Sequence, residues 1–449
     1  MAGQSTNRLQ VSGYRFLMRR MAHALVRGDV RMLEDPTRAQ SLSLAAGCVL
    51  AAIAVAACAV LAFLQPKGSV GDTAIVMARE SGALYVRIDD TMHPTFNLAS
   101  ARLITGATDA PVLVSSTALD RAKRGPYVGI PGAPDTIAAP LGVGESVWTV
   151  CEDATASTTV LVGRPPAHLD SGQNALVTPR GESAATTYLL YDGRRARVDL
   201  RNHAVVRALK LDGVVPRPIS RALLDALPEA PEIAAPAVPG RGISPSAIPG
   251  VPTGVVVRLT RAGSAEYYVA LPNGVQRVGE VTADLIRFTY PSRRDIGTVA
   301  PDLIGRMPIV DELPVTGFPD FGGAAESPVL CVRAGAVLTG DSMTSDEHIV
   351  QLAQGDKAGP HVDRFAMPPG RSAYVRAASV SGEVAASGSL FLVNDSGVLF
   401  GIRDADAATR LGLTNPLPAP WALLAQLPRG PELSVEAASV GRDSVGPVS

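Results

Sequence analysis

The four cysteines are the residues of this sequence with the most distinctive covalent chemistry. Cys48 and Cys58 lie in an uncharged apolar run; on a helix, ten residues separate them by ~15 Å, which is too far for a disulfide. We expect these two to be packing residues. Cys151 and Cys331 are the remaining pair. In an oxidising compartment they are expected to form a disulfide, with two buried free thiols as the alternative.

The sequence gives little support for a metal site or a nucleotide-binding site. The histidines are scattered, with no His or Cys pair at ligand spacing: His23, His93, His168, His203, His348 and His361. A phosphate-binding P-loop requires a Gly-Lys dipeptide, and none occurs. We therefore predict no metal site and no cofactor.

Nucleophilic and acid–base motifs are also missing. Gly144-Glu-Ser146 and Gly340-Asp-Ser342 lack the closing glycine of a serine-hydrolase elbow. Two carboxylate pairs, Asp89-Asp90 and Asp404/Asp406, stand beside turn signals, so we interpret them as solvated turns. The sequence offers no positive indication of catalysis.

A membrane anchor is the clearest element. Residues 42–64 contain no charged residue, and a helix needs about 20 apolar residues to cross a bilayer. The alternative to a membrane-spanning helix is a helix buried in the core of a soluble domain. A signal peptide has a shorter apolar region nearer the start of the chain, so we interpret this run as a permanent span.

The flanking charges predict the orientation of that span. Seven arginines precede it, against three acidic residues, whereas the matching stretch after it carries Lys67 and Arg79 with Asp72 and Glu80. The positive-inside rule places the N-terminus in the cytoplasm and residues 65–449 outside the membrane. A net charge of −1, from 41 basic and 42 acidic residues, argues against nucleic-acid binding.

The segment before the span is predicted to be a basic amphipathic helix over 12–34, with Ser12 as N-cap. Such a helix can lie on the lipid bilayer or dock on a cytoplasmic partner; a simple stop-transfer flank is the alternative. The candidate partner-interface residues are Arg15, Phe16, Arg19, Arg20, Leu25 and Arg31.

Internal similarity organises the rest of the chain. Ala222-Leu-Leu-Asp-Ala-Leu-Pro228 matches Ala422-Leu-Leu-Ala-Gln-Leu-Pro428 at an offset of 200 residues (222 to 422), and preceding β-rich runs with turn signals match as well. Weaker copies lie around 83–104 and 267–286. Only 4% of residues are aromatic, while 43 Gly and 36 Pro favour short strands and turns.

We therefore expect an α-helical N-terminal segment and span followed by a β-rich α+β ectodomain, with pseudo-two-fold symmetry and four repeats around a central domain. The boundaries are a cytoplasmic segment 1–41, span 42–64, linker and repeat one 65–126, central parts 127–185 and 313–385, repeats two to four 186–233, 253–312 and 386–433, a Pro-rich connector 234–252, and a flexible tail 434–449.

The stretch from Val11 to Met32, with Ser12-Gly-Tyr-Arg-Phe-Leu-Met-Arg-Arg-Met-Ala-His-Ala-Leu-Val-Arg-Gly-Asp inside it, carries a family resemblance. Together with the single span, the repeats, the cysteine pair and Ile130-Pro-Gly-Ala-Pro-Asp135, it resembles the EccB family of type VII (ESX) secretion systems of mycobacteria and related actinobacteria. The resemblance implies a central β-rich domain flanked by repeats, and assembly with EccC, EccD and EccE. It also implies an ATPase activity that has been attributed to the family.

Three functions follow as hypotheses. The first is a structural translocon subunit that scaffolds protein export and whose periplasmic ectodomain self-associates. The second is an envelope ATPase, and the third a cell-wall module that binds peptidoglycan.

Overall fold

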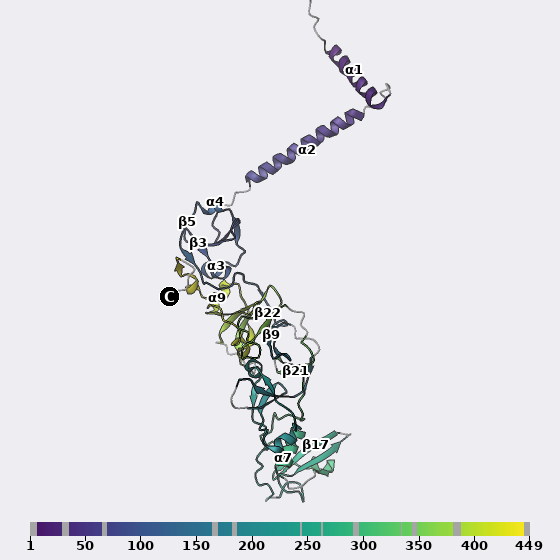
Figure 1. The fold of residues 1–449 in the computed structure, drawn as a ribbon, viewed down its shortest axis with the longest axis vertical. Helices are drawn as coiled ribbons and strands as arrows, with labels where there is room; N and C mark the ends of the chain where they lie inside the picture. Colours follow the sequence, from purple (N-terminus) through teal and green to yellow (C-terminus); the bar gives the residue numbers. More distant parts are fainter. Residues whose placement is uncertain are drawn as a thin grey trace, which may run out of the picture. The chain divides into compact units, whose positions relative to one another are not determined.

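The computed structural model describes residues 7–28, 36–64, 70–163, 169–181, 186–242, 245–261, 264–290, 296–333, 335–343, 348–379 and 388–443. The chain divides into two compact units, residues 1–69 and 70–449. The first unit contains two helices, and the second, which we call the ectodomain, is rich in β-strands (Figure 1).

The N-terminal helix α1 spans Arg8–Arg27 and begins earlier than predicted. Asn7 is its N-cap, and the Asn7 amide donates to Gln10 Oε1 at 3.3 Å. Gly28 ends the helix with φ 67°, a left-handed conformation that suits glycine. Ser12 is therefore not the cap; it lies inside the helix, where its hydroxyl donates to Leu9 O. Arg31 falls outside the described residues.

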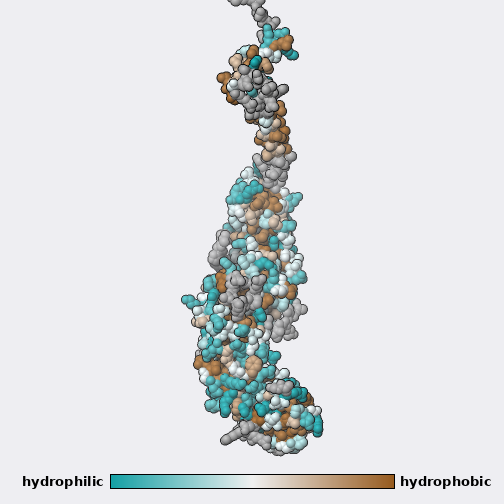
Figure 2. All heavy atoms as spheres, turned by 90° about the vertical axis from the view of Figure 1, so that its right-hand side faces the viewer, coloured by the Kyte–Doolittle hydropathy of each residue, from teal (hydrophilic) through white to brown (hydrophobic). Residues whose placement is uncertain are grey.

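Helix α2 spans Pro36–Leu64 and contains the predicted span. Its section Ser41–Val60 has a mean hydropathy of 2.4, and none of it is buried. Among the described residues this is the one helix long and apolar enough to cross a membrane. Figure 2 shows its brown, hydrophobic surface. Cys48 and Cys58 are exposed and unbonded on it.

The first sheet of the ectodomain is built on an antiparallel β1–β2–β3 meander, and β4 returns parallel to β1. Helix α3 covers one face through Ala101 and Ile104, and α4 covers the other through Leu119. The bounds are β1 Ile75–Ala78, β2 Leu84–Ile88, β3 Thr91–Thr95, α3 Leu98–Thr105, β4 Val112–Val114, α4 Ser116–Leu119, β5 Lys123–Arg124 and β6 Tyr127–Val128.

A second sheet contains β11–β12–β13, antiparallel, with β14 parallel to β11 and β15 parallel to β13. Asp192 and Gly193 form its hairpin turn with φ 40° and 70°, as the Asp-Gly pair predicts. The bounds are β11 Ala175–Pro179, β12 Tyr188–Tyr191, β13 Arg194–Arg197, α5 His203–Ala208, β14 Arg217–Ile219, α6 Arg221–Asp225 and β15 Glu229–Ala230.

The third sheet contains the hairpin and helix predicted around 267–286. In it β16, β17 and β18 pair antiparallel and β19 runs parallel to β16. The bounds are β16 Val256–Arg261, β17 Ser264–Leu271, β18 Gly274–Val278, α7 Glu280–Thr289, β19 Gly297–Val299 and α8 Pro301–Gly305.

The fourth sheet pairs β24, β25 and β26 antiparallel, with β27 and the short β7 parallel to β24. The bounds are β7 Ala139–Pro140, β24 Arg371–Ala378, β25 Leu390–Asn394, β26 Leu399–Ile402, α9 Ala405–Arg410, β27 Leu417–Pro420 and α10 Trp421–Leu424.

A seven-stranded central sheet has the order β10-β21-β20-β8-β9-β23-β22. One large core of buried residues joins it to the second and fourth sheets, through side chains such as Val150, Leu190 and Val393. The bounds are β8 Trp148–Glu152, β9 Thr158–Val162, β10 Asp170–Ser171, β20 Val329–Arg333, β21 Ala336–Gly340, β22 Ile349–Gln351 and β23 Arg364–Ala366.

The segment that ends at Arg442 is packed and does not form a free tail. Helix α11 (Val435–Ala438) packs on α3, and β28 (Gly441–Arg442) pairs with β6; in Figure 1 this yellow segment lies beside the blue first sheet. The prediction of a flexible tail from 434 is wrong for these residues, because Ala438 is fully buried against α3. In the connector 234–252, Val238 and Ile248 are buried.

Candidate functional site

A disulfide lies at the centre of the ectodomain. Strands β8 and β20 are antiparallel neighbours, and Cys151 stands directly opposite Cys331 in their register. The sulfurs are 2.03 Å apart and the Cα atoms 4.0 Å. Both side chains are completely buried, together with Leu161 and Leu338 on one face of the central sheet. The predicted disulfide is confirmed, and the alternative of two free thiols is wrong.

Glu152 follows Cys151 on β8, so its side chain points to the opposite face of the sheet. It is 1% exposed. Burial raises the pKa of Glu152, against the opposing effects of the Ser220 backbone N–H and the Arg180 guanidinium. Ser220 N donates to Glu152 Oε2 at 2.9 Å, and Arg180 Nη2 makes an ion pair with the same oxygen. This carboxylate therefore ties β8 to the second sheet.

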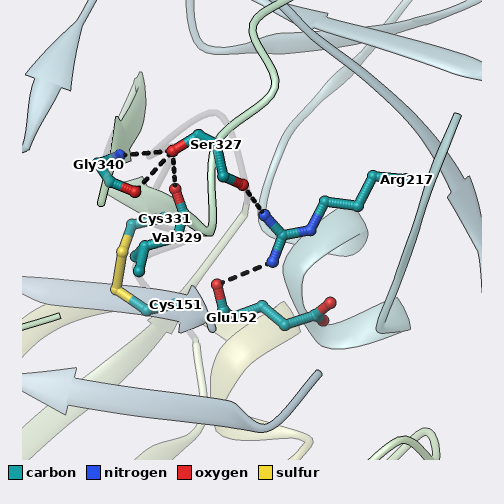
Figure 3. The surroundings of a disulfide bond; sticks show 7 residues. All are labelled: Cys151, Glu152, Arg217, Ser327, Val329, Cys331 and Gly340. Carbon is teal, nitrogen blue, oxygen red and sulfur yellow. Dashed lines mark hydrogen bonds between the residues drawn. A yellow bond between two sulfur atoms is a disulfide. The ribbon is translucent and has the colours of Figure 1, made fainter. Parts of the chain in front are cut away.

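Arg217 on β14 makes a second connection, shown in Figure 3. Its Nη2 donates to the backbone carbonyls of Glu152 and Asp153, both at 3.1 Å, and its Nη1 donates to Ser327 O at 2.6 Å. The Ser327 hydroxyl in turn accepts from Gly340 N at 2.8 Å. One guanidinium thus joins the second sheet to β8 and to the segment that leads into β20.

Asp153 extends the cluster toward β23. It pairs with Arg364 and accepts from Thr155 Oγ1 at 2.6 Å and Ser157 N at 3.2 Å. Burial alone would raise the pKa of Asp153, but these hydrogen bonds and the Arg364 charge outweigh it and lower the pKa. Asp363 beside Arg364 accepts from Thr158 N at 2.8 Å, so backbone and side chains lock β9 to β23.

The chemistry of this cluster is structural. Its carboxylates are used by arginines and backbone amides, although Glu152 Oε1 and Arg180 Nε have no hydrogen-bond partner among the described residues. The hollow beside Arg217 measures about 140 Å³, below the ~300–1,000 Å³ typical of small-molecule sites. Across the residues that the structure describes, no three potential metal ligands gather.

Asp89-Asp90 lies in a turn, as predicted, whereas Asp404 and Asp406 belong to the start of helix α9 and not to a turn. Asp89 lies in the β2–β3 turn with φ 52°. Asp404 caps α9 by accepting from Ala407 N at 2.8 Å, and Asp406 pairs with Arg410 one helical turn away.

The candidate partner-interface residues on α1 are only partly brought together. Arg15, Phe16 and Arg19 line one hollow along the helix with Arg8, Val11 and Ser12. Arg20 lies one turn beyond Phe16 on the same side. Leu25 is nine residues from Phe16, which on a helix places it on the opposite side, and it is 86% exposed.

Sequence reasoning missed the buried ion pairs. Glu152 was the available signal: it ends Trp148-Thr-Val-Cys-Glu152, a strand in which every residue is buried, and a buried charge requires a partner. Arg180 and Arg217 lie 28 and 65 residues later, so no local pattern identifies them as that partner.

The fold and this centre define a class: a protein with one candidate spanning helix and a β-rich ectodomain that is held together by a buried disulfide and structural ion pairs. A family model described as "Type VII secretion system ESX-1, transport TM domain B" matches residues 3–447. The chain belongs to this family, the EccB proteins of type VII secretion systems.

Characterised relatives and structures agree with this assignment. The chain is 35% identical to the "ESX-3 secretion system ATPase EccB3" of Mycolicibacterium smegmatis, over 98% of this chain and 91% of the relative. It is 38% identical to the "ESX-2 secretion system ATPase EccB2" of Mycobacterium tuberculosis, over 98% and 96%.

Among solved structures, a chain of an intact ESX-5 inner membrane complex matches with a TM-score of 0.70 and 32% identity, over 100% of this chain and 98% of that one. The EccB3 dimer from the ESX-3 core complex matches with a TM-score of 0.70 and 32% identity, over 82% of this chain and 100% of that one.

Proposed function

We propose that this chain is a structural subunit of a type VII secretion complex in the inner membrane, with its N-terminus in the cytoplasm and its ectodomain in the periplasm. The observation that carries the proposal is the contrast between the two units. Helix α2 exposes an apolar surface of membrane-spanning length, whereas the charged centre of the ectodomain is engaged in holding sheets together. The arginines before the span favour this orientation, and a disulfide suits the periplasm.

The ectodomain is, in this proposal, two copies of one half related by a pseudo-two-fold axis. Each of the four small sheets has a three-stranded antiparallel meander, a helix, and a strand parallel to the first. Cys151 and Cys331 pair across antiparallel strands, which is the arrangement that a local two-fold axis between β8 and β20 requires. The axis would relate the first sheet to the third and the second to the fourth.

Helix contacts support the same correspondence. Helix α3 of the first sheet packs on α9 of the fourth, and α5 of the second packs on α7 of the third. Helices α6 and α10, which occupy equivalent places, pack on each other. We place β11 and β24 at the start of repeats two and four, so that these repeats begin at 175 and 371 rather than at 186 and 386.

Partners are proposed on two surfaces. The ectodomain would associate with further copies, as in the EccB3 dimer. The basic helix α1 and the span would contact EccC, EccD and EccE type subunits, through Arg15, Phe16, Arg19 and Arg20, with Leu25 and Arg31 serving a separate surface or none.

Extraction of native membranes in mild detergent tests the proposal. Affinity purification of the full chain should recover secretion-complex subunits at defined stoichiometry, and the particle should exceed a monomer in size. Charge reversal at Arg15 and Arg19 should reduce the recovered partners. The matched control reverses Arg306 and Arg403, which are exposed in the ectodomain. A chain that stays monomeric and alone would sink the proposal.

An ATPase is the second candidate, because characterised relatives carry that word in their names. No Gly-Lys dipeptide is present to hold phosphates, so such a site would use another design. Equilibrium binding of ATP to the purified full chain decides: one nucleotide per chain, with turnover removed by a single substitution, would favour the enzyme.

A further inference from the structure

An open hollow of about 400 Å³ lies where the first and fourth sheets meet. Its walls are largely apolar and come from segments far apart in sequence: Phe96, Pro131, Ala133, Pro134, Val398 and Phe400. Asp135 and Asn394 are on its lining as well. Phe96 also stacks on Tyr127, with ring centroids 5.5 Å apart, so the aromatic wall is held in place.

The turn that forms one wall has a counterpart in the other half of the ectodomain. The turn Ile130–Ala133 is closed by a hydrogen bond from Ala133 N to Ile130 O at 3.2 Å, and the turn Val315–Phe318 by one from Phe318 N to Val315 O at 3.1 Å. The third residue is a glycine with positive φ in both, Gly132 at 77° and Gly317 at 90°. A Pro-Asp dipeptide follows each turn.

Both Pro-Asp dipeptides meet the N-terminus of a repeat helix. Pro134 O and Asp135 O accept from Ala99 N and Leu98 N at the start of α3. Asp320 lies against Gly279, the N-cap of α7, so closely that a Cβ there would stand 3.0 Å from its Oδ1. The two turns thus occupy the same place relative to α3 and α7.

The two sheet junctions differ in the side chains that lie beside the turn. At the junction of the second and third sheets, the Phe318 ring packs into the cores of both sheets, Tyr191 Oη donates to Gly317 O at 2.9 Å, and the Arg194 guanidinium lies against Gly317. At the junction of the first and fourth sheets, Ala133 stands in the place of Phe318. The cross-strand pair Tyr191↔Arg194 corresponds to Asn394 and Val398, because Arg195 N and Leu399 N, which follow Arg194 and Val398, donate to the equivalent carbonyls of Pro228 and Pro428. Asn394 and Val398 both line the hollow.

We infer that the hollow at Ala133 is a docking site for an aromatic side chain of a partner polypeptide, flanked by a basic residue. The filled junction shows the matching chemistry, a phenylalanine ring beside an arginine. The exposed Asp135 carboxylate complements the basic residue, and the apolar walls suit the ring. This inference goes beyond the proposed assembly role and rests on the correspondence of the two halves.

The test uses the full-length chain in detergent and the probe acetyl-(4-fluoro-Phe)-Arg-amide, followed by ligand-observed ¹⁹F NMR. We expect saturable line broadening in the millimolar range, competed by acetyl-Phe-Arg-amide and not by acetyl-Ala-Arg-amide. The variant Ala133→Phe reproduces the filled junction and should weaken binding at least about tenfold, because the side chain occupies the hollow.

A second variant guards against misfolding of the first. Asp135→Asn, at an exposed position, should weaken the arginine probe about three- to fivefold and leave the corresponding Phe-Glu probe no worse bound. Asp89→Asn in the β2–β3 turn is the matched control and should bind as the parent does.

Unchanged affinity in Ala133→Phe with retained thermal unfolding, or no saturable binding of the probe, overturns the inference. So does displacement by the N-acetylglucosamine dimer in place of the peptide, which would make the hollow a glycan site. Because the assembly test above reads particle size and partners, failure of one experiment is distinguishable from failure of the other.

Discussion

At the scale of single residues, this protein places its charges where they hold strands together. Glu152 and Asp153 are adjacent, yet their pKa values shift in opposite directions, because Glu152 is more completely buried whereas Asp153 receives hydrogen bonds from three residues. Two neighbouring carboxylates in two environments therefore respond differently to substitution and to pH.

Glu152→Gln is expected to destabilise the ectodomain by about 3 kcal/mol at neutral pH. The substitution leaves the Arg180 guanidinium, 12% exposed, without its counter-charge, and breaking a buried pair costs ~3–5 kcal/mol. Both tryptophans, Trp148 and Trp421, lie in the ectodomain, so their intrinsic fluorescence follows its unfolding. The control Glu432→Gln breaks an exposed pair with Arg403 and should change stability by less than ~1 kcal/mol.

Protonation of Asp153 should lower the stability of the folded ectodomain at acid pH. Its pKa in the folded protein is below the reference value of 3.8, so its contribution is fully present above that pH and is lost as the pH falls through the folded value. Asp153→Asn should therefore be less stable than the parent at pH 6, and the difference should shrink below about pH 4. Thermal unfolding from pH 3 to 7 measures this; a constant difference across the range would contradict it.

At the scale of elements, the position of a short hairpin depends on its turn residues and on the residues that the turn contacts. The β12–β13 turn packs so closely against the β20–β21 turn that a Cβ on Gly193 would overlap the Gly335 backbone. The second sheet and the central sheet thus meet at two hairpin tips, and glycine is required there for space as well as for its φ of 70°.

Gly193→Ala should destabilise the ectodomain by about 2–3 kcal/mol, since it combines a left-handed backbone conformation with a steric overlap. Gly213→Ala is the matched control: its φ is 77°, but no atom lies within 4 Å of a Cβ placed there. That variant should lose only about 1 kcal/mol. Urea unfolding of both variants, followed by tryptophan fluorescence, separates the two contributions. Equal losses would show that the contact with Gly335 is unimportant.

At the scale of the whole molecule, covalent and non-covalent links join distant parts of the chain. The disulfide joins residues 180 positions apart, Arg217 joins the second sheet to the approach to β20, and α11 with β28 brings the end of the chain back to the first sheet. The ectodomain is therefore closed in three places by contacts of high sequence separation.

Replacing both cysteines, as Cys151→Ala with Cys331→Ala, should lower the stability of the ectodomain by about 3–5 kcal/mol, because the bridge restricts the unfolded chain over a long loop. The pair is buried, so alanines also remove packed sulfur atoms. The fold itself should persist, since the β8–β20 register is supported by the neighbouring hydrogen bonds.

The double variant Cys48→Ala with Cys58→Ala, on the exposed surface of α2, is the control and should unfold with the parent. Tryptophan fluorescence of the full chain reports both. Loss of all cooperative unfolding in the first variant would mean that the bridge determines the fold and does more than stabilise it.

Features that depend on neighbouring residues or on composition could be predicted from the sequence. An uncharged run of sufficient length defines a helix that can span a membrane, and two cysteines outside the span leave one disulfide pairing. Asp192-Gly193 defines a hairpin because few residues accept its positive φ angles. Asn273-Gly274 marks a second hairpin, in which Gly274 pairs with Leu271. Similar sequence segments 200 residues apart indicated internal repeats.

The contacts between distant groups became known only from the folded structure. The partners of Glu152, the filling of one junction by Phe318 and not the other, and the return of residues 435–442 to the first sheet all depend on contacts between separate sheets. No local preference specifies such contacts, because burial and pairing of a side chain arise only when the sheets have packed. The polar segment from 434 was predicted to be a flexible tail for that reason.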